Sequence, residues 1–115
     1  MSWWEDFFDD LDSLDIDRAS VWYNDDIELR AGNSPIFRGK QAAVAALTHA
    51  CTNLRGLKHD IDYVVVSGEE VFIGCHVTFD YKDGRTVKIP AATYLRRAQN
   101  AIQTLHVYQH IPEAG

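Results

Sequence analysis

The sequence has few residues that cross-link a chain or interrupt helices and strands, with two cysteines and three prolines in 115 residues. It also contains only one methionine. Cys51 and Cys75 form no spaced motif, so we expect two free thiols in the core and neither a disulfide nor a cysteine-bound metal. No apolar run approaches the ~20 residues of a membrane-spanning helix. Repeats and low-complexity tracts are also missing, so we expect a single domain over residues 1–115.

Positive charge is scarce, since 11 lysines and arginines oppose 17 aspartates and glutamates and leave a net charge of -6. Most of the acids precede residue 30, and such a surface repels phosphate. The only basic cluster is the pair Arg96 and Arg97, so we expect no nucleic-acid partner. The acidic run indicates a solvated helix face, with a partner-docking surface as the alternative. The opening segment lacks the basic region of a secretory signal, so we expect a cytoplasmic protein that does not bind membranes.

The spacing of apolar residues predicts three helices in the first half of the chain. An amphipathic helix is predicted over residues 3–14, because apolar residues recur there at intervals of three and four. Asp15 or Asp17 can cap a short second helix. The alanine-rich segment from Lys40 contains no internal glycine or proline and predicts a third helix that ends at Gly56.

From Leu57 onward, apolar and polar residues alternate with the period of a β-strand. Turn signals, including the Asp-Gly pair at 83–84, divide this half into a four-stranded antiparallel meander. Pro90 falls within one strand and requires a bulge or an edge position there. In the first of these strands the alternation places His59 and Tyr63 on the buried face. Helices followed by such strands predict an α+β fold, with the three N-terminal helices on one face of an antiparallel sheet.

The order helix, helix, short strand, helix and meander is accompanied by the strings YNDDIELRAGNSPIFRGKQAAV, LKHDID, VTFDYKDGRTVKIPAATYLRR and AIQTLHVYQHIP. Together they resemble the SnoaL-like branch of the nuclear transport factor 2-like superfamily over nearly the whole chain. The resemblance implies a cone-shaped sheet, a pocket between sheet and helices, and a homodimer formed through the outer face of the sheet. It implies no single function, because relatives include steroid isomerases, polyketide cyclases, epoxide hydrolases, dehydratases and proteins that only bind.

Two well-defined mechanisms of the superfamily are disfavoured by the residues present. A site like that of ketosteroid isomerase needs a carboxylate base, a tyrosine and a protonated carboxylic acid. An ungapped comparison puts these roles at Phe7, Ala31 and Ala92, none of which can carry a proton. A site similar to limonene epoxide hydrolase needs an Arg-x-Asp pair on a strand and a second aspartate, which the segments GCHVTF and TYLRR do not supply.

Histidines are the remaining acid–base candidates. SnoaL-like cyclases are understood to use an aspartate in a late Tyr-x-Asp string, and the string YQH at 108–110 puts His110 in that place. Imidazole has an ordinary pKa of about 6.5 and can exchange a proton near neutrality. The alternative is that His110 only lies at the solvated rim of the pocket. His59 points inward beside Tyr63, with a hydrogen-bonded core histidine as the alternative. Asp25 can orient an imidazole or act as a base, unless it is solvated at a strand start.

We expect the polar groups of the pocket to converge on these histidines. Histidines and tyrosines in an apolar cone also resemble the scytalone-dehydratase-like members, which eliminate water without a metal. Zinc held by His59, His106 and His110 is the metal alternative, but their spacing is not that of a helical or tight-turn ligand set, so we expect no metal and no other cofactor. The predicted catalytic residues are His59, His110, Tyr63 and Asp25, and the predicted ligand-binding residues are Trp22, Tyr23, Asn33, Cys75, Phe79, Tyr94, His106 and Tyr108.

These residues are compatible with more than one class of function. The first is a cofactor-free acid–base enzyme that isomerises, cyclises or dehydrates a small apolar oxygenated molecule, such as a polyketide, terpenoid or steroid-like compound. The second is a binding or accessory domain that keeps the pocket and has lost the chemistry. The third is a pure dimerisation module with a filled cone. The sequence leaves these three open.

Overall fold

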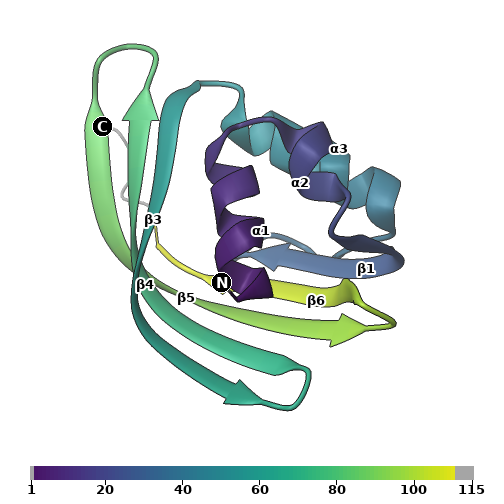
Figure 1. Cartoon of the computed structure of the whole chain (residues 1–115). Coiled ribbons are helices and arrows are strands. Elements are labelled where there is room, and N and C mark those ends of the chain that lie inside the picture. Colours follow the sequence, from purple (N-terminus) through teal and green to yellow (C-terminus); the bar gives the residue numbers. More distant parts are fainter. Residues whose placement is uncertain (1, 111–115) are drawn as a thin grey trace.

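The computed structural model describes residues 2–110 as a six-stranded sheet bent around three helices (Figure 1). The helices are α1 (Trp3–Asp12), α2 (Ile16–Ser20) and α3 (Lys40–Cys51). The strands are β1 (Tyr23–Ala31), β2 (Phe37–Arg38), β3 (Leu54–Ser67), β4 (Glu70–Tyr81), β5 (Thr86–Ala98) and β6 (Ala101–Tyr108). The helices lie within the bend of the sheet, and the predicted α+β fold class is confirmed.

The apolar stripe of α1 determines how this helix lies on the sheet. Phe7, Phe8 and Leu11 are buried, and their spacing of three and four places them on one face of the helix. The next helix, α2, has Asp15 as its N-cap, whose side chain accepts a 3.1 Å hydrogen bond from the backbone amide of Arg18. Within residues 2–110, no helix is long and apolar enough to cross a membrane.

The third helix is shorter than predicted. It ends at Cys51 rather than at Gly56, and β3 has already begun at Leu54. Leu54 is only 6% exposed, and Gly56 lies opposite Asp80 of β4. Burying a leucine side chain is worth about 1.5–3 kcal/mol, whereas helix propensities differ by only tenths of a kcal/mol per residue. Strand packing therefore outweighs the local preference for helix at this boundary.

The strands follow the order β2-β1-β6-β5-β4-β3 across the sheet. Strands β3 to β6 form the predicted antiparallel meander. Two features were not predicted, namely that β2 pairs with β1 and that β1 runs parallel to β6. Pro90 of β5 lies beyond the end of β6, because the pairing of these strands begins with Ala92 and Tyr108. It occupies a local edge position, as its missing amide hydrogen requires.

A bulge at Asp62 reverses the two faces of β3. The β3–β4 ladder pairs Ile61 with Cys75 and then Tyr63 with Gly74. Asp62 lies between these pairs as the extra residue, and one extra residue moves every later side chain to the opposite face. Tyr63 is accordingly 74% exposed, and the prediction that it points into the pocket is wrong.

The two faces of the sheet differ in what covers them. The inner face packs against the helices and forms one hydrophobic core with them. The outer face, opposite the helices, is not covered by any segment of residues 2–110 and carries large exposed apolar side chains. These are Tyr63, Val65, Phe72 and Tyr108.

Candidate active site

The bent sheet and the helices enclose a cavity of about 140 Å³, which we call the inner cavity. Its walls come from α1, α3 and every strand except β2, so the pocket that the resemblance implied is present. The lining is mostly apolar and contains no lysine, arginine, aspartate or glutamate. It consists of Phe8, Leu11, Leu29, Ala31, Leu47, Ala50, Cys51, Leu54, Leu57, His59, Val77, Phe79, Tyr81, Thr93, Leu105, Val107 and Gln109.

His59 lines this cavity in a fixed orientation. Its side chain is 9% exposed, and its ring packs against Phe8 with the ring centroids 4.6 Å apart. Nδ1 of His59 lies 2.6 Å from Oδ1 of Asp12. The backbone amide of His59 donates to the other carboxylate oxygen, Oδ2, at 2.9 Å. Asp12, at the end of α1, therefore holds both the strand and the ring.

The carboxylate of Asp12 also decides which imidazole nitrogen is free. An ionised carboxylate only accepts hydrogen bonds, so Nδ1 of His59 carries the hydrogen and donates it. Nε2 makes no hydrogen bond to any residue between 2 and 110 and is the proton acceptor when the ring is neutral. A carboxylate that orients a neutral imidazole in this way is the arrangement used for general-base catalysis. Sequence reasoning found His59 and missed Asp12.

Besides His59, Cys51 and Tyr81, two further polar side chains line the inner cavity. Thr93 is 3% exposed, and its register places it on the inner face beside Ile73 and Val107. Gln109 follows the end of β6 and also lines the cavity. In the part of the chain that the structure describes, neither side chain makes a hydrogen bond. Both are therefore available to bind an oxygen atom of a ligand.

The two cysteines are free thiols, as predicted. Cys51 lines the inner cavity, and burial raises its pKa. Burial, with a smaller contribution from the carboxylates of Asp62 and Asp12, raises the pKa of Cys75 to about 11. Thiols of raised pKa stay protonated near neutrality and are poor nucleophiles. Cys75 packs in the core and does not line the cavity, whereas Phe79 lines it as predicted.

The end of β6 corrects the placement of His110. Side chains alternate along the strand, so Val107 and Gln109 line the inner cavity and Tyr108 faces outward. His110 is exposed. His110, which the resemblance put at the acid–base position, thus points away from the cavity, and Gln109 beside it cannot exchange a proton near neutrality.

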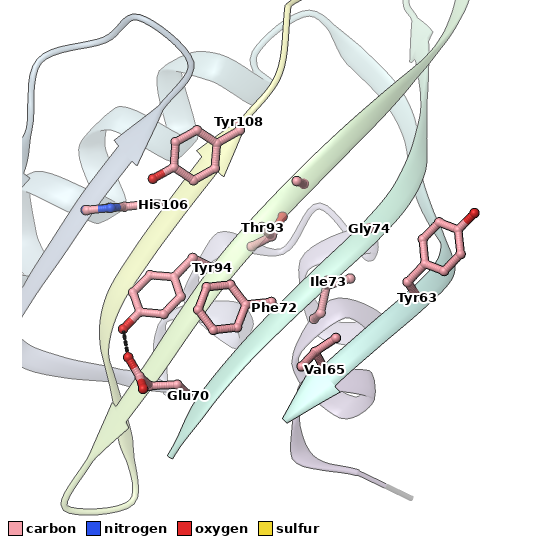
Figure 2. Close-up of a pocket in the computed structure, with 11 residues that line it drawn as sticks. Tyr63, Val65, Glu70, Phe72, Ile73, Gly74, Thr93, Tyr94, His106 and Tyr108 are labelled. Atoms are coloured by element: carbon pink, nitrogen blue, oxygen red, sulfur yellow. Dashed lines mark hydrogen bonds between the residues drawn. The ribbon is translucent and has the colours of Figure 1, made fainter. Parts of the chain in front are cut away.

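Tyr94, His106 and Tyr108 lie on the outer face rather than in the inner cavity. With the exposed Tyr63 they border an open groove of about 490 Å³ (Figure 2), which we call the outer groove. In Figure 2 the rings of Phe72 and Tyr94 lie side by side, with centroids 4.9 Å apart. The outer groove is lined by Tyr63, Val65, Glu70, Phe72, Ile73, Gly74, Ala92, Thr93, Tyr94, His106 and Tyr108.

Ionisable groups of the outer face are paired with one another. The Tyr94 hydroxyl donates to Oε1 of Glu70 at 2.6 Å, and this hydrogen bond raises the pKa of Tyr94. Nε2 of His106 lies 2.8 Å from Oε2 of Glu28, whose Oε1 accepts a 2.7 Å hydrogen bond from Arg38. These partners, His106 first, lower the pKa of Glu28. The pairs leave none of these groups free for catalysis at the groove.

The remaining predicted site residues also lie outside the inner cavity. Nε1 of Trp22 donates to Oδ2 of Asp10 at 2.8 Å, between α1 and the start of β1. Tyr23 is buried in the core, where its hydroxyl has no partner among residues 2–110 and burial raises its pKa. Asp25 and Asn33 are exposed near the two ends of β1. The predicted convergence of these side chains on the histidines is therefore wrong.

The zinc site considered from the sequence is not assembled. His59 lines the inner cavity, His106 lies on the outer groove, and His110 is exposed. Across residues 2–110, no three side chains of the kinds that bind metals lie together.

Solved structures share this fold at low sequence identity. A candidate polyketide cyclase from Xanthomonas campestris pv. campestris has a TM-score of 0.83 at 17% identity, over 92% of this chain and 86% of that one. A protein with a ketosteroid isomerase-like fold from Catenulispora acidiphila, in complex with trimethylamine, has a TM-score of 0.81 at 13% identity, over 91% and 82%. An LEH-like epoxide hydrolase from M. tuberculosis has a TM-score of 0.78 at 16% identity, over 90% and 77%.

At these identities the likeness establishes the fold and leaves the chemistry to the site. No curated protein sequence matches the chain. The family model of the SnoaL-like domain matches residues 4–104. Because this match spans most of the chain, and the bent sheet, helices and inner cavity are those of the fold, the chain belongs to the SnoaL-like domain family.

Proposed function

We propose that this SnoaL-like protein is a cofactor-free enzyme that moves a proton on a small apolar oxygenated molecule held in the inner cavity. The observation that carries the proposal is the pair of His59 and Asp12 at a mostly apolar cavity. A neutral imidazole that a carboxylate orients, and that is largely screened from water, can take a proton from a substrate and return it.

Isomerisation, cyclisation and dehydration can all begin with one step. Nε2 of His59 takes a proton from a carbon next to a substrate carbonyl, and the electron pair left behind forms an enolate. The imidazolium then returns the proton, to another carbon in an isomerisation, to the new alkoxide in an aldol cyclisation, or to the departing hydroxyl in a dehydration. Asp12 stays ionised and stabilises the imidazolium between the two transfers.

The enolate oxygen requires a hydrogen-bond donor in an apolar cavity. Donors that are already positioned where negative charge develops lower the barrier more than donors that must reorient. The Thr93 hydroxyl and the Gln109 amide are two of the uncommitted donors of the lining. They support the proposal by supplying, with neutral groups, the role that other members of the superfamily give to acids.

The test is exchange of substrate protons for deuterium in D₂O, followed by mass spectrometry on a panel of small ketones, enones and hydroxyketones. His59→Gln is expected to lower exchange by about 100-fold or more. The matched control is His76→Gln, because Nδ1 of His76 pairs with Asp62 at the same 2.6 Å distance on the outer face. The control variant should exchange at the wild-type rate. Unchanged exchange in His59→Gln contradicts the proposal.

A binding or accessory domain is the second candidate function. It is favoured by the outward position of His110 and by the apolar residues at the compared isomerase positions. Enzyme and binding domain would both be stabilised by small apolar ligands. Only the enzyme would release a product of changed structure or isotope content, so the mass-spectrometric assay separates the two.

We further propose that the protein forms a homodimer through its outer face. Four large side chains are exposed there without cover, namely Tyr63, Val65, Phe72 and Tyr108. A contiguous exposed apolar patch of this kind marks an interface more often than bare surface. Phe72→Lys is expected to shift the mass measured by light scattering from dimer to monomer. The control is Val21→Lys, which alters an exposed apolar side chain beside α2; a monomeric wild-type protein would contradict the proposal.

A further inference from the structure

The volume of the inner cavity limits the size of what it can hold. An engineered apolar cavity of about 150 Å³ binds benzene, whereas pockets for drug-sized ligands measure about 300–1,000 Å³. At about 140 Å³, the inner cavity has room for one six-membered ring with a small substituent. A steroid or a fused-ring polyketide has several rings and does not fit.

The walls that set this volume belong to the core of the protein. Leu54, Val77 and Phe79 are between 1% and 8% exposed, so the closed end of the cavity cannot widen without disturbing packed strands. The lining is more open at Ala50 of α3, which is exposed, and at the half-buried Gln109. The more exposed part of the lining thus includes residues of α3 and the end of β6, whereas Leu54, Val77 and Phe79 of β3 and β4 form buried walls.

The polarity of the lining limits the charge and the oxygen content of the ligand. No lysine or arginine lines the cavity, so a phosphate or carboxylate would lose its hydration without gaining a counter-ion. Thr93 and Gln109 can each bind one oxygen, and Nε2 of His59 can accept one proton. Apart from Cys51 and Tyr81, the other side chains of the lining are apolar.

From these limits we infer that the substrate is an uncharged single-ring or similarly small compound of about 6–10 non-hydrogen atoms that carries one or two oxygens. Thr93 binds its carbonyl or hydroxyl oxygen and sets the specificity for an oxygenated ring. That this ligand is a substrate rests on the proposed function. The inference narrows the expected substrates, which were polyketides, terpenoids or steroid-like compounds, to the smallest compounds of these classes.

A size series tests this inference by direct binding to the full chain. The probes are phenol, 2-cyclohexenone, 1-tetralone and a four-ring steroid ketone, with benzoate as the charged single-ring probe. Amide chemical-shift changes report whether a probe contacts the inner cavity or the outer groove. The two neutral single-ring probes are expected to bind the inner cavity with dissociation constants of about 10 µM to 1 mM, and the other three at least 10-fold more weakly.

Variants of the lining link the binding to this cavity. Phe79→Leu and the milder Leu57→Ala, at a half-buried position, both enlarge the cavity and are expected to admit 1-tetralone. The matched control, Phe72→Leu, makes the same change on the outer face and should not. Thr93→Val keeps the side-chain shape and is expected to weaken 2-cyclohexenone by about 3- to 10-fold while leaving toluene unchanged.

Three results would overturn the inference. They are tight binding of 1-tetralone or the steroid ketone in the wild-type inner cavity, binding of benzoate equal to that of phenol, and no binding of any single-ring probe there. Proton exchange measured in the same samples keeps the two proposals apart. Binding of single-ring probes without proton exchange would contradict the proposed enzyme and support the inferred ligand size. His59-dependent exchange on the steroid ketone would support the proposed enzyme and contradict the inferred ligand size.

Discussion

Asp12 holds both the backbone amide and the imidazole of His59, with hydrogen bonds of 2.9 and 2.6 Å that span 47 positions of the sequence. Asp12 is the last residue of α1, and His59 lies in β3. One carboxylate thus docks the helix onto the strand and sets the tautomer of the ring that faces the inner cavity. Stability and proposed chemistry depend on the same pair.

Removing this carboxylate should weaken the fold as well as the site. Asp12→Ala leaves the His59 amide and Nδ1 without their acceptor, and such a loss costs about 1–3 kcal/mol of the free energy of unfolding. Urea denaturation measures it. Asp9→Ala, on the exposed side of the same helix, should change stability by less than about 0.5 kcal/mol. Equal effects of the two substitutions would show that the Asp12–His59 pair does not dock α1.

The fold was predictable from local patterns because its long elements obey them. The stripe of α1 and the alternation of β4 and β5 follow directly from periods of 3.6 and 2. The helix end near Cys51 was missed because burial of Leu54 overrides local propensity. The parallel pairing of β1 with β6 leaves no local trace at all, since it joins segments separated by most of the chain.

The site was less predictable, and three of its residues show why. Alternation located His59, but the bulge at Asp62 reversed the strand after it, and a single extra residue has no reliable signature in the sequence. Tyr63 was therefore misplaced. Asp12 was missed because it reads as one more acid of a solvated helix, and only the tertiary fold brings it to His59. The resemblance predicted His110 as the acid–base residue, but the alternation of side chains places its neighbour Gln109 on the cavity side instead.

Both thiols should resist alkylation in the native protein. The pKa of Cys75 is about 11 and that of Cys51 is raised by burial, so at pH 8 only about one in a thousand Cys75 side chains is a thiolate. Iodoacetamide at pH 8 is expected to modify neither residue at an appreciable rate until urea unfolds the chain. Mass spectrometry of tryptic peptides measures each site separately. Rapid native modification of Cys75 would contradict its buried position.

The pair of Glu28 and His106 should make part of the stability depend on pH. The lowered pKa of Glu28 means that its ionised form favours the folded state. This contribution is present above the ordinary carboxyl pKa and is lost as the pH falls through the lower, folded-state value. Glu28→Gln is expected to cost about 0.5–1 kcal/mol at pH 7, and the difference from wild type should vanish in acid. Asp26→Asn, at an exposed neighbouring position, is the matched control for the loss of one carboxylate.

The Tyr63 ring should be energetically coupled to Gly74, its partner across the β3–β4 ladder. A Cβ added at Gly74 would lie 2.9 Å from Cδ2 of Tyr63, closer than carbon atoms approach without displacement. Alanine otherwise favours a strand over glycine by about 0.5–1 kcal/mol. Gly74→Ala is therefore expected to destabilise the wild-type chain or leave it unchanged, and to stabilise the Tyr63→Ala chain by about that amount. A double-mutant cycle in urea measures the coupling. Additive effects would mean that the ring does not rest on Gly74, and that the face reversed by the bulge is not held in this arrangement.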